Sequence, residues 1–373
     1  MAHKAERALF ELRQGRALCV TTEDPGPAAL VAAVEVFGSE RLVQLRTLGG
    51  ELRLIVTHHR GRAMGLASPA LSTDLSMALT GEVTPESILR LATSPRVPAL
   101  NGRSGVRSAT TAEVAGLALA RFGRLLPAVV SLPVDPAGPP LRKWLGRGDI
   151  LDVSSSEIEY VVAQPGIEVT HVAEAPVPLA DAEHSRFVFF REGGGFLEHV
   201  AVLIGPREAW PDPVPVRLHS ACLTGDLFGS LRCDCGEQLR GSLQHFASRG
   251  GGVLVYLSQE GRGIGLGNKI RAYTLQEEGL DTVDADGVLG FGADERRYDA
   301  AVAILAHLGI ERVHLLTNNP EKVRAVQGGG IEVVERIGLQ GGVNRHNLRY
   351  FQAKVHRSGH WLMEAISQPI PGD

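Results

Sequence analysis

The sequence has few cysteines, no long apolar run and no excess of basic residues. Four cysteines among 373 residues are too few and too unevenly placed for a disulfide framework. No apolar run reaches the roughly 18 residues that a membrane-spanning helix needs, and the first residues contain no apolar signal core. A net charge of −4 provides no basic footprint of the kind that neutralises nucleic-acid phosphates. We therefore expect a cytoplasmic protein that inserts in no membrane and binds no nucleic acid.

Length and composition predict two globular domains. The chain is longer than a usual single domain, and its hydrophobic content of 44% with 21% charged residues is typical of soluble globular proteins. Proline and glycine are dense between Pro133 and Pro140, which predicts a linker there and a domain border between residues 135 and 165. We expect an N-terminal domain over residues 1–150 and a C-terminal domain over residues 165–365.

Hydrophobic periodicity predicts helices and strands in both domains. In the first, we expect helices over 4–14 and 111–121 and strands over 17–20 and 54–57. In the second, we expect strands over 186–191, 200–204, 214–219, 253–257, 313–316 and 331–335, and helices over 266–278 and 320–327. Two apolar stripes indicate further helices, at Leu239, Leu243 and Phe246 and at Ala301, Ile304, Leu305 and Leu308. The predicted fold class is α/β (α+β), with a mixed sheet and flanking helices in the C-terminal domain.

Three of the four cysteines form a cluster that predicts a metal site. Cys222, Cys233 and Cys235 fall within 14 residues, whereas Cys19 lies in a distant apolar run and is interpreted as a packing residue. Three thiolates leave the fourth position of a tetrahedral zinc ion open for water, which is typical of catalytic zinc. Two alternatives stay open, namely a structural zinc completed by His219 and reduced cysteines packed in a core.

A glycine-rich turn at residues 259–269 has the chemistry to bind an anion. Its backbone N–H groups suit a phosphate, and Arg262 adds a bidentate donor. Glu260 beside it can accept hydrogen bonds from a guanine edge. The turn matches neither a Walker A motif nor a dinucleotide fingerprint, so a loop that only reverses the chain is the alternative. This turn and the one at Thr317 both follow predicted strands, the position where ligands gather in parallel α/β sheets.

Six ordered motifs together resemble GTP cyclohydrolase II over roughly residues 165 to 365. They are HSACLTGD (219–226), LRCDCG (231–236), QEGRGIGL (259–266), NKIRAY (268–273), DTV (281–283) and LLTNNP (315–320). The resemblance implies the first step of riboflavin biosynthesis, in which GTP yields 2,5-diamino-6-(5-phosphoribosylamino)pyrimidin-4(3H)-one, formate and diphosphate. It also implies one Zn²⁺ per subunit, Mg²⁺ with the triphosphate, and a homodimer.

Carried over position by position, the resemblance implies a role for each matching residue. Cys222, Cys233 and Cys235 become the zinc ligands, and water activated by the zinc attacks C8 of the guanine. Asp294 is implied as proton acceptor, Arg296 as nucleophile toward the α-phosphorus, and Tyr273 as a residue that completes the hydrolysis. The implied GTP contacts are Arg217, Leu218, His219, Ser220, Ala221, Gln238, Glu260, Gly261, Arg262, Thr282, Thr317 and Lys322. Because the pKa of arginine lies above about 12, a phosphate clamp stays the alternative role for Arg296.

The sequence departs from the family pattern at two positions and throughout its first 150 residues. The family usually has glutamate where this chain has Ala221, and asparagine is common where Asp286 stands. Residues 6–20 and 121–127 resemble 3,4-dihydroxy-2-butanone 4-phosphate synthase. The acidic Mg²⁺-binding cluster of that enzyme is reduced here to Glu23 and Asp24, followed by prolines. We therefore expect a degenerate, noncatalytic N-terminal domain. The rival interpretations are a bifunctional riboflavin-pathway enzyme and a noncatalytic GTP-binding zinc regulator.

Overall fold

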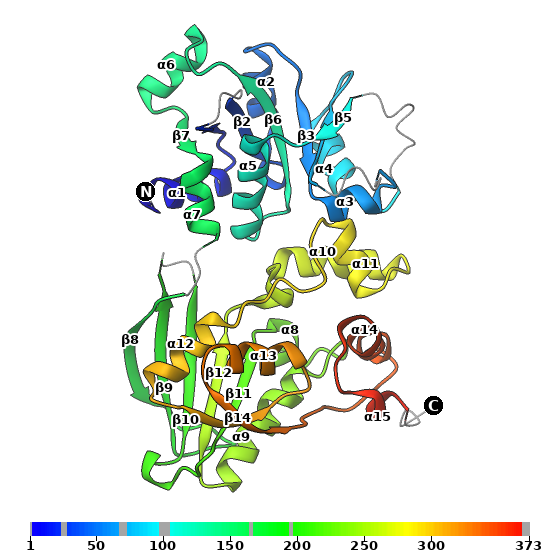
Figure 1. Ribbon diagram of the computed structural model, residues 1–373. Helices are drawn as coiled ribbons and strands as arrows, with labels where there is room; N and C mark the ends of the chain where they lie inside the picture. Colours follow the sequence, from blue (N-terminus) through cyan, green and yellow to red (C-terminus); the bar gives the residue numbers. More distant parts are fainter. Residues whose placement is uncertain are drawn as a thin grey trace. The chain divides into compact units, whose positions relative to one another are not determined.

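The computed structural model describes residues 2–23, 28–66, 73–96, 105–163, 167–193 and 197–367. The chain divides into two compact units, the first formed by residues 1–164 with 267–294 and the second by residues 165–266 with 295–373 (Figure 1). The segment 267–294, which the sequence analysis includes in the C-terminal domain, therefore packs with the first unit. Within the described ranges, no helix is both long enough and apolar enough to cross a membrane.

The first unit is built on a seven-stranded sheet with the order β5-β4-β3-β6-β2-β1-β7. Strands β1 and β7 run parallel, and the other neighbouring strands run antiparallel. The strands are β1 (Leu18–Thr21), β2 (Ala28–Ala33), β3 (Arg53–Val56), β4 (Leu75–Ala78), β5 (Val106–Ser108), β6 (Ala128–Val134) and β7 (Leu151–Ser154). The helices are α1 (Ala2–Arg13), α2 (Ser39–Arg46), α3 (His58–Ala63), α4 (Pro85–Thr93), α5 (Thr111–Phe122), α6 (Pro139–Arg147), α7 (Ser155–Val162), α10 (Leu266–Glu277), α11 (Thr282–Val288) and the short 3-10 helix η1 (Val34–Val36).

Helices α1, α5 and α7 form the main core of the first unit with the sheet. Leu12 of α1, Leu119 of α5 and Ile158 of α7 are fully buried in one apolar cluster. Thr110 and Ser154 begin α5 and α7 with capping boxes, because each side chain accepts a hydrogen bond from the third residue of its helix. The helices predicted over 4–14 and 111–121 are confirmed within a few residues.

The predicted linker between Pro133 and Pro140 is wrong. Strand β6 extends through Pro133 to Val134, and helix α6 begins at Pro139. Proline is compatible with the first turn of a helix, since the N–H that it lacks would have no partner there. A cluster of prolines therefore marks a strand end and a helix start here, and β7 and α7 follow before the first unit ends.

The second unit contains a mixed, seven-stranded sheet with the order β14-β13-β11-β12-β10-β9-β8. Strands β14, β13, β11 and β12 run parallel, and β10, β9 and β8 continue the sheet in antiparallel fashion. The strands are β8 (Val169–Pro176), β9 (Ser185–Glu192), β10 (Glu198–Ile204), β11 (Val214–Ser220), β12 (Gly252–Leu257), β13 (Arg312–Leu316) and β14 (Glu332–Ile337). The helices are α8 (Leu223–Asp226), α9 (Cys235–Ser248), α12 (Asp299–His307), α13 (Pro320–Gly328), α14 (Leu348–Ser358), α15 (Met363–Ile366), η2 (Arg207–Ala209) and η3 (Glu260–Gly263). This sheet confirms the predicted mixed α/β fold.

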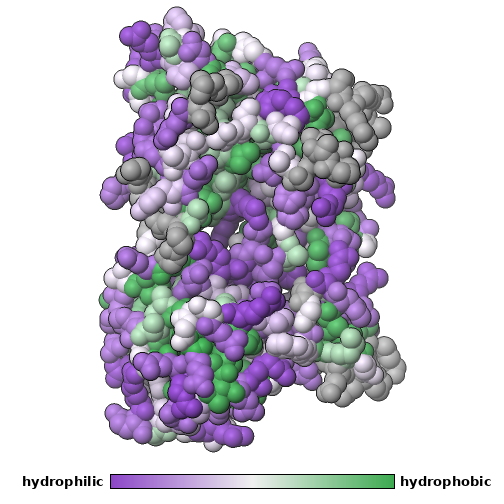
Figure 2. Space-filling model, viewed as in Figure 1, coloured by the Kyte–Doolittle hydropathy of each residue, from purple (hydrophilic) through white to green (hydrophobic). Residues whose placement is uncertain are grey.

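Helices cover both faces of the second sheet. On one face, α12 and α13 pack through Ile304 and Val326 against Val216 and Leu218 of β11 (Figure 1). On the other, α9 packs through Phe246 against β10 and β12. Both predicted apolar stripes therefore lie in the core. The visible face of each unit is mostly hydrophilic, with apolar residues in short separate patches (Figure 2).

Candidate functional site

The candidate site lies where the parallel strands β11, β12 and β13 end. Side chains alternate along β11, so Val216 and Leu218 enter the apolar core under α12 while Arg217 and His219 point to the face covered by α9. Arg217 and His219 are 5% and 2% exposed, which makes them two buried polar groups in the centre of a sheet. Buried polar groups need partners, and the segments that follow the three strands supply them.

The three predicted cysteines come together just beyond β11. Cys222 precedes α8, Cys235 is the first residue of α9, and the three Sγ atoms lie within 4.8 Å of one another. The Sγ atoms of Cys222 and Cys233 are 3.7 Å apart. Zn–S bonds of about 2.3 Å in a tetrahedron would place two sulfurs about 3.8 Å apart. The spacing of the thiols therefore fits a zinc ion.

Gly225 provides the space for this cluster. A Cβ atom at this position would lie 2.7 Å from Sγ of Cys233 and 3.1 Å from Sγ of Cys222. Contacts that short would push the sulfurs apart, so only glycine allows the three thiols to converge. The helical turn of α8 thus forms one wall of the candidate metal site.

Two of the thiols would lose their protons at neutral pH only beside a cation. Hydrogen bonding to Cys222 raises the pKa of Cys233 to about 11, and contact with the other two thiols raises the pKa of Cys235. Three neighbouring thiolates are stable only when a metal ion compensates their charge. Within the described part of the chain, the three cysteines are the whole group of converging ligands. The alternative of a zinc ion completed by His219 is therefore not supported.

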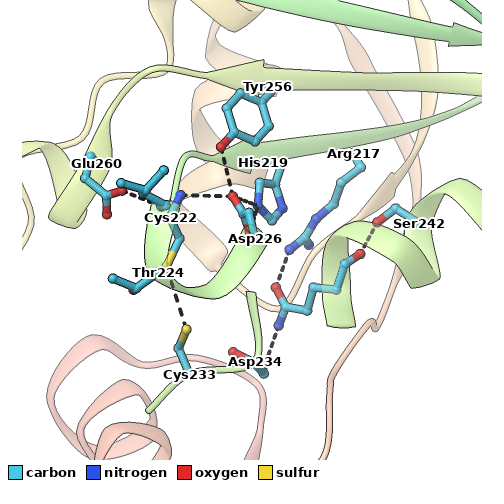
Figure 3. A network of polar contacts seen from close by, with 12 residues as sticks. Arg217, His219, Cys222, Thr224, Asp226, Cys233, Asp234, Ser242, Tyr256 and Glu260 are labelled. Carbon is cyan, nitrogen blue, oxygen red and sulfur yellow. Dashed lines mark hydrogen bonds and ion pairs between the residues drawn. The ribbon is translucent and has the colours of Figure 1, made fainter. Parts of the chain in front are cut away.

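Asp226 connects His219 to the cysteine cluster (Figure 3). Its carboxylate accepts hydrogen bonds from Nε2 of His219 (3.0 Å), the backbone N–H of Cys222 (3.0 Å) and the hydroxyl of Tyr256 (2.9 Å). Burial lowers the pKa of His219, so its imidazole is neutral at physiological pH. Asp226 and Tyr256 were absent from the predicted site, although Asp226 ends the first of the recognised motifs.

A second polar chain runs from Arg217 to helix α14. Arg217 donates to the carbonyl oxygen of Leu316 (2.8 Å) and to the side chain of Gln238, and the amide of Gln238 donates to Asp234. Asp234, the residue between Cys233 and Cys235, pairs with Lys354 of α14 at 2.9 Å. The ion pair is almost fully buried, with side-chain exposures of 0% and 11%. It fastens α14 to the cysteine loop.

The predicted phosphate turn is a tight, glycine-dependent loop at the end of β12. Gly261 and Arg262 both have positive φ angles, of 63° and 59°. At Gly263, a Cβ atom would lie 2.7 Å from the carbonyl of Glu295. The N–H of Glu295 donates to the carbonyl oxygen of Arg262 at 3.0 Å. The turn is thus held directly against the segment that carries Arg296.

Glu260 ties the same turn to the cysteine cluster. Its carboxylate accepts the N–H groups of Leu223 (2.6 Å) and Gly261 (2.9 Å). Gln259, which the predicted site did not include, donates to Ser220 (3.0 Å) and accepts from the N–H of Arg297 (3.2 Å). These contacts bring the ends of β11 and β12 together.

Positive charges gather at the end of β13. Nζ of Lys322 donates to the carbonyl oxygen of Leu218 at 2.6 Å, and the Thr317 hydroxyl accepts the N–H of Asn319 at 3.0 Å. Burial, together with the charges of Lys354, Arg296, Lys322 and Arg262, lowers the pKa of His360 to about 3. Several of the cations that we expect to bind phosphates therefore lie around His360, which favours the binding of a polyanion in this region.

The predicted residues fall in both units. Tyr273 on α10, Thr282 at the start of α11 and Asp294 belong to the first unit. The other predicted residues belong to the second unit. There, Glu260 binds the N–H of the residue after Cys222, and Lys322 binds a carbonyl oxygen of β11. In the first unit, Glu23 accepts a hydrogen bond from Ser156 (2.9 Å), and Asp24 lies outside the described residues.

Comparisons with known proteins show what the chain is similar to. Residues 170–338 match the family model of GTP cyclohydrolase II. The chain is 41% identical to GTP cyclohydrolase-2 of Azospirillum brasilense over 95% of this chain and 93% of that protein. It is 52% identical to GTP cyclohydrolase-2 of Pseudomonas aeruginosa (strain LESB58), over 52% of this chain and 95% of that protein. A two-domain 3,4-dihydroxy-2-butanone 4-phosphate synthase from A. baumannii aligns over 90% of this chain and 100% of that one, with 16% identity and a TM-score of 0.34, too low to support an inference.

The second unit is thus an α/β fold with three converging thiols, which could hold a metal ion, at the carboxyl edge of its parallel strands. Three ligands that leave a coordination position open are typical of a catalytic metal site, and ligands of parallel α/β sheets gather at this edge, so the fold and the site are those of an enzyme. The identity to relatives over nearly their whole length identifies the enzyme family: the chain belongs to the GTP cyclohydrolase II family.

Proposed function

We propose that this protein is a zinc-dependent GTP cyclohydrolase II. In this reaction GTP is hydrolysed to 2,5-diamino-6-(5-phosphoribosylamino)pyrimidin-4(3H)-one, formate and diphosphate, the first step of riboflavin biosynthesis. The observation that carries the proposal is the convergence of Cys222, Cys233 and Cys235 within 4.8 Å beside the turn at Glu260, in a chain of this family.

The three cysteines would hold one Zn²⁺ per subunit. When bound there, zinc would lower the pKa of a coordinated water molecule to about 7, which is the chemistry that opening a guanine imidazole ring at C8 requires. Three protein ligands leave a coordination position for that water. Asp226 links the neutral imidazole of His219 to the cysteine cluster. The imidazole is available there as a hydrogen-bonding group for the substrate.

The cationic residues beyond β12 and β13 would bind the triphosphate. Arg262, Arg296 and Lys322 are three of the four cations that lower the pKa of His360, and Mg²⁺ would balance the remaining negative charge of the triphosphate. Of the two roles for Arg296, the phosphate clamp needs no deprotonation of the guanidinium. The family role as nucleophile would need Asp294 as the base. Tyr273 and Thr282 keep their proposed roles in completing the hydrolysis and in binding GTP.

One assay tests the proposal. The purified protein is incubated with GTP, Zn²⁺ and Mg²⁺, and formate, diphosphate and the diaminopyrimidinone chromophore are followed together. We expect all three products in the wild type. Cys233→Ser should lose formate release because serine is a poor zinc ligand, whereas Cys19→Ala, which changes a buried cysteine outside the cluster, should retain it. Turnover by zinc-free protein at the wild-type rate would contradict the proposal.

A noncatalytic GTP-binding regulator is the second candidate, and Ala221 favours it. This position, directly before Cys222, lacks the carboxylate that the family usually has there. Tight GTP binding without formate or diphosphate would support the regulator. Recovery of a faster reaction in Ala221→Glu would show that the missing carboxylate had limited an enzyme.

We further propose residues 165–365 as the catalytic domain and residues 1–150 as a noncatalytic domain related to butanone-phosphate synthase. The support is the reduced acidic cluster, in which Glu23 already accepts a hydrogen bond from Ser156. Hard cations such as Mg²⁺ need several oxygen ligands. Formation of a butanone phosphate from ribulose 5-phosphate by the full chain would overturn this proposal and favour a bifunctional enzyme. A homodimer is also proposed, and the sedimentation of the purified protein tests it.

A further inference from the structure

Asp226 makes hydrogen bonds with both polar groups of the Cys222 backbone. Its own N–H donates to the carbonyl oxygen of Cys222 at 2.7 Å, and its carboxylate accepts the N–H of Cys222 at 3.0 Å. The two polar groups of the Cys222 backbone are therefore fixed by one residue, and the direction of the Cα–Cβ bond follows. We infer that Asp226 is a positioning residue, which aims the Cys222 thiolate at the metal and holds His219 in one tautomer. This inference rests on the proposed zinc site.

The hydrogen bonds around Asp226 determine the tautomer of His219. An ionised carboxylate only accepts hydrogen bonds, so Nε2 of His219 and the hydroxyl of Tyr256 must both donate to it. Nδ1 of the neutral imidazole then carries the lone pair. This atom is buried and has no hydrogen-bond partner among the described residues. Asp226 thus leaves His219 with an unused acceptor that can take an N–H or O–H donor of a substrate.

The ring of His219 is also held by packing. It stacks on Tyr256 with ring centroids 5.5 Å apart and planes 18° apart, and the same Tyr256 hydroxyl binds Asp226 (Figure 3). The strands β11 and β12 place the two rings opposite each other, because His219 and Tyr256 are register partners. Asp226, His219 and Tyr256 therefore form one rigid unit behind Cys222.

Asp226→Asn is the sharpest perturbation of this unit. Asparagine keeps the size of the side chain but replaces one acceptor oxygen by an NH₂ donor. At least one of the three donors, on His219, Cys222 or Tyr256, would then face another donor. Residues that orient metal ligands typically change metal affinity by about 10–100-fold when they are replaced. We expect Asp226→Asn to bind one zinc ion per chain with an affinity weakened by about that factor.

The test measures zinc affinity by competition with a chelator of known affinity, with the full-length protein and circular dichroism to verify folding. Tyr256→Phe, which removes one of the three donors, should lie between the wild type and Asp226→Asn. Asp181→Asn is the matched control, because that carboxylate accepts one hydrogen bond from Gln244 in the same unit (2.8 Å), and it should bind zinc as the wild type does. Cys222→Ser should lose the site.

A spectroscopic measurement separates positioning from simple loss of stability. Bound Co²⁺ reports the geometry of a thiolate site through its visible absorption. We expect Asp226→Asn to shift the thiolate-to-cobalt bands of the folded protein, whereas instability alone would lower their intensity in proportion to the folded fraction. Wild-type zinc affinity with an unshifted cobalt spectrum in Asp226→Asn would overturn the inference and leave the proposed function intact. If Asp226→Asn does not fold, wild-type affinity and spectrum in Tyr256→Phe overturn it instead. A wild-type protein that binds no zinc would overturn both.

Discussion

Breaking the buried ion pair between Lys354 and Asp234 should strongly destabilise the second unit. The pair is 2.9 Å long, and the Asp234 side chain has no exposed surface. Replacing Lys354 by methionine keeps the length of the side chain but leaves the carboxylate of Asp234 buried with Gln238 as its remaining side-chain partner. Breaking a buried pair in this way costs about 3–5 kcal/mol. We expect Lys354→Met to lower the free energy of unfolding by that amount.

The contribution should also depend on pH. Burial alone would raise the pKa of Asp234, but the charge and hydrogen bond of Lys354 outweigh burial and lower it. Burial alone would lower the pKa of Lys354, but the charges of Tyr350, Asp234 and Cys235 raise it. Because the carboxyl pKa is lowered, the contribution of the ion pair to the free energy of unfolding disappears as pH falls below about 4. Because the amine pKa is raised, this contribution is lost at high pH only above about 10. Between these limits it should be constant.

Urea denaturation followed by tryptophan fluorescence measures this effect. The chain has three tryptophans, and a Trp144→Phe background leaves Trp210 and Trp361, both in the second unit, as reporters. The control is Arg186→Met in the same unit, because the Arg186–Glu174 pair of 2.8 Å is 50% and 44% exposed and should contribute at most about 1 kcal/mol. The double variant Lys354→Met with Asp234→Asn should recover part of the loss, since no charge stays buried. A loss in Lys354→Met no larger than in Arg186→Met would refute the reasoning.

Three further predictions concern the metal site, the first unit and the cationic cluster. Gly225→Ala should lose zinc because its Cβ would lie 2.7 Å from Sγ of Cys233; full zinc occupancy by elemental analysis would contradict the space argument. Glu113→Gln should destabilise the first unit by about 1.5–3 kcal/mol at pH 7, because the buried carboxylate accepts two hydrogen bonds from Arg107, at 2.8 and 2.9 Å. Burial would raise the pKa of Glu113, but these bonds lower it overall. The difference in urea midpoint between the wild type and Glu113→Gln should therefore shrink as pH falls below about 4, and equal midpoints of the two proteins at pH 7 would contradict this prediction. His360 should not titrate between pH 8 and 5, since burial and the surrounding cations lower its pKa to about 3. Its NMR signal is assigned by comparison with His360→Asn. A titration midpoint near 6.5 would show that burial and the cations do not act on His360 in this way.

The sequence by itself determined the elements whose signal is local. The apolar runs at 253–257 and 313–316 predict buried strands because a parallel strand is covered on both faces, and β12 and β13 occupy those residues. The stripe Leu239, Leu243 and Phe246 predicts the buried face of α9 because helical periodicity aligns those side chains. The three cysteines were found because a metal site needs several ligands of one chemical kind, and two of them are separated by only one residue.

Only the tertiary structure decided which distant groups meet. Lys354 lies 120 residues from Asp234, and no local pattern indicates that α14 supplies the counter-charge for the cysteine loop. Residues 267–294 join the first unit although the chain on either side belongs to the second, because contacts such as the hydrogen bond from the Thr57 hydroxyl to the carbonyl oxygen of Gly290 do not follow order along the chain. Asp226 resembles any surface acid at the end of a short helix until β11 and β12 place His219 and Tyr256 beside it. The cysteines were visible in the sequence, but the residues that aim them depend on where three strands end.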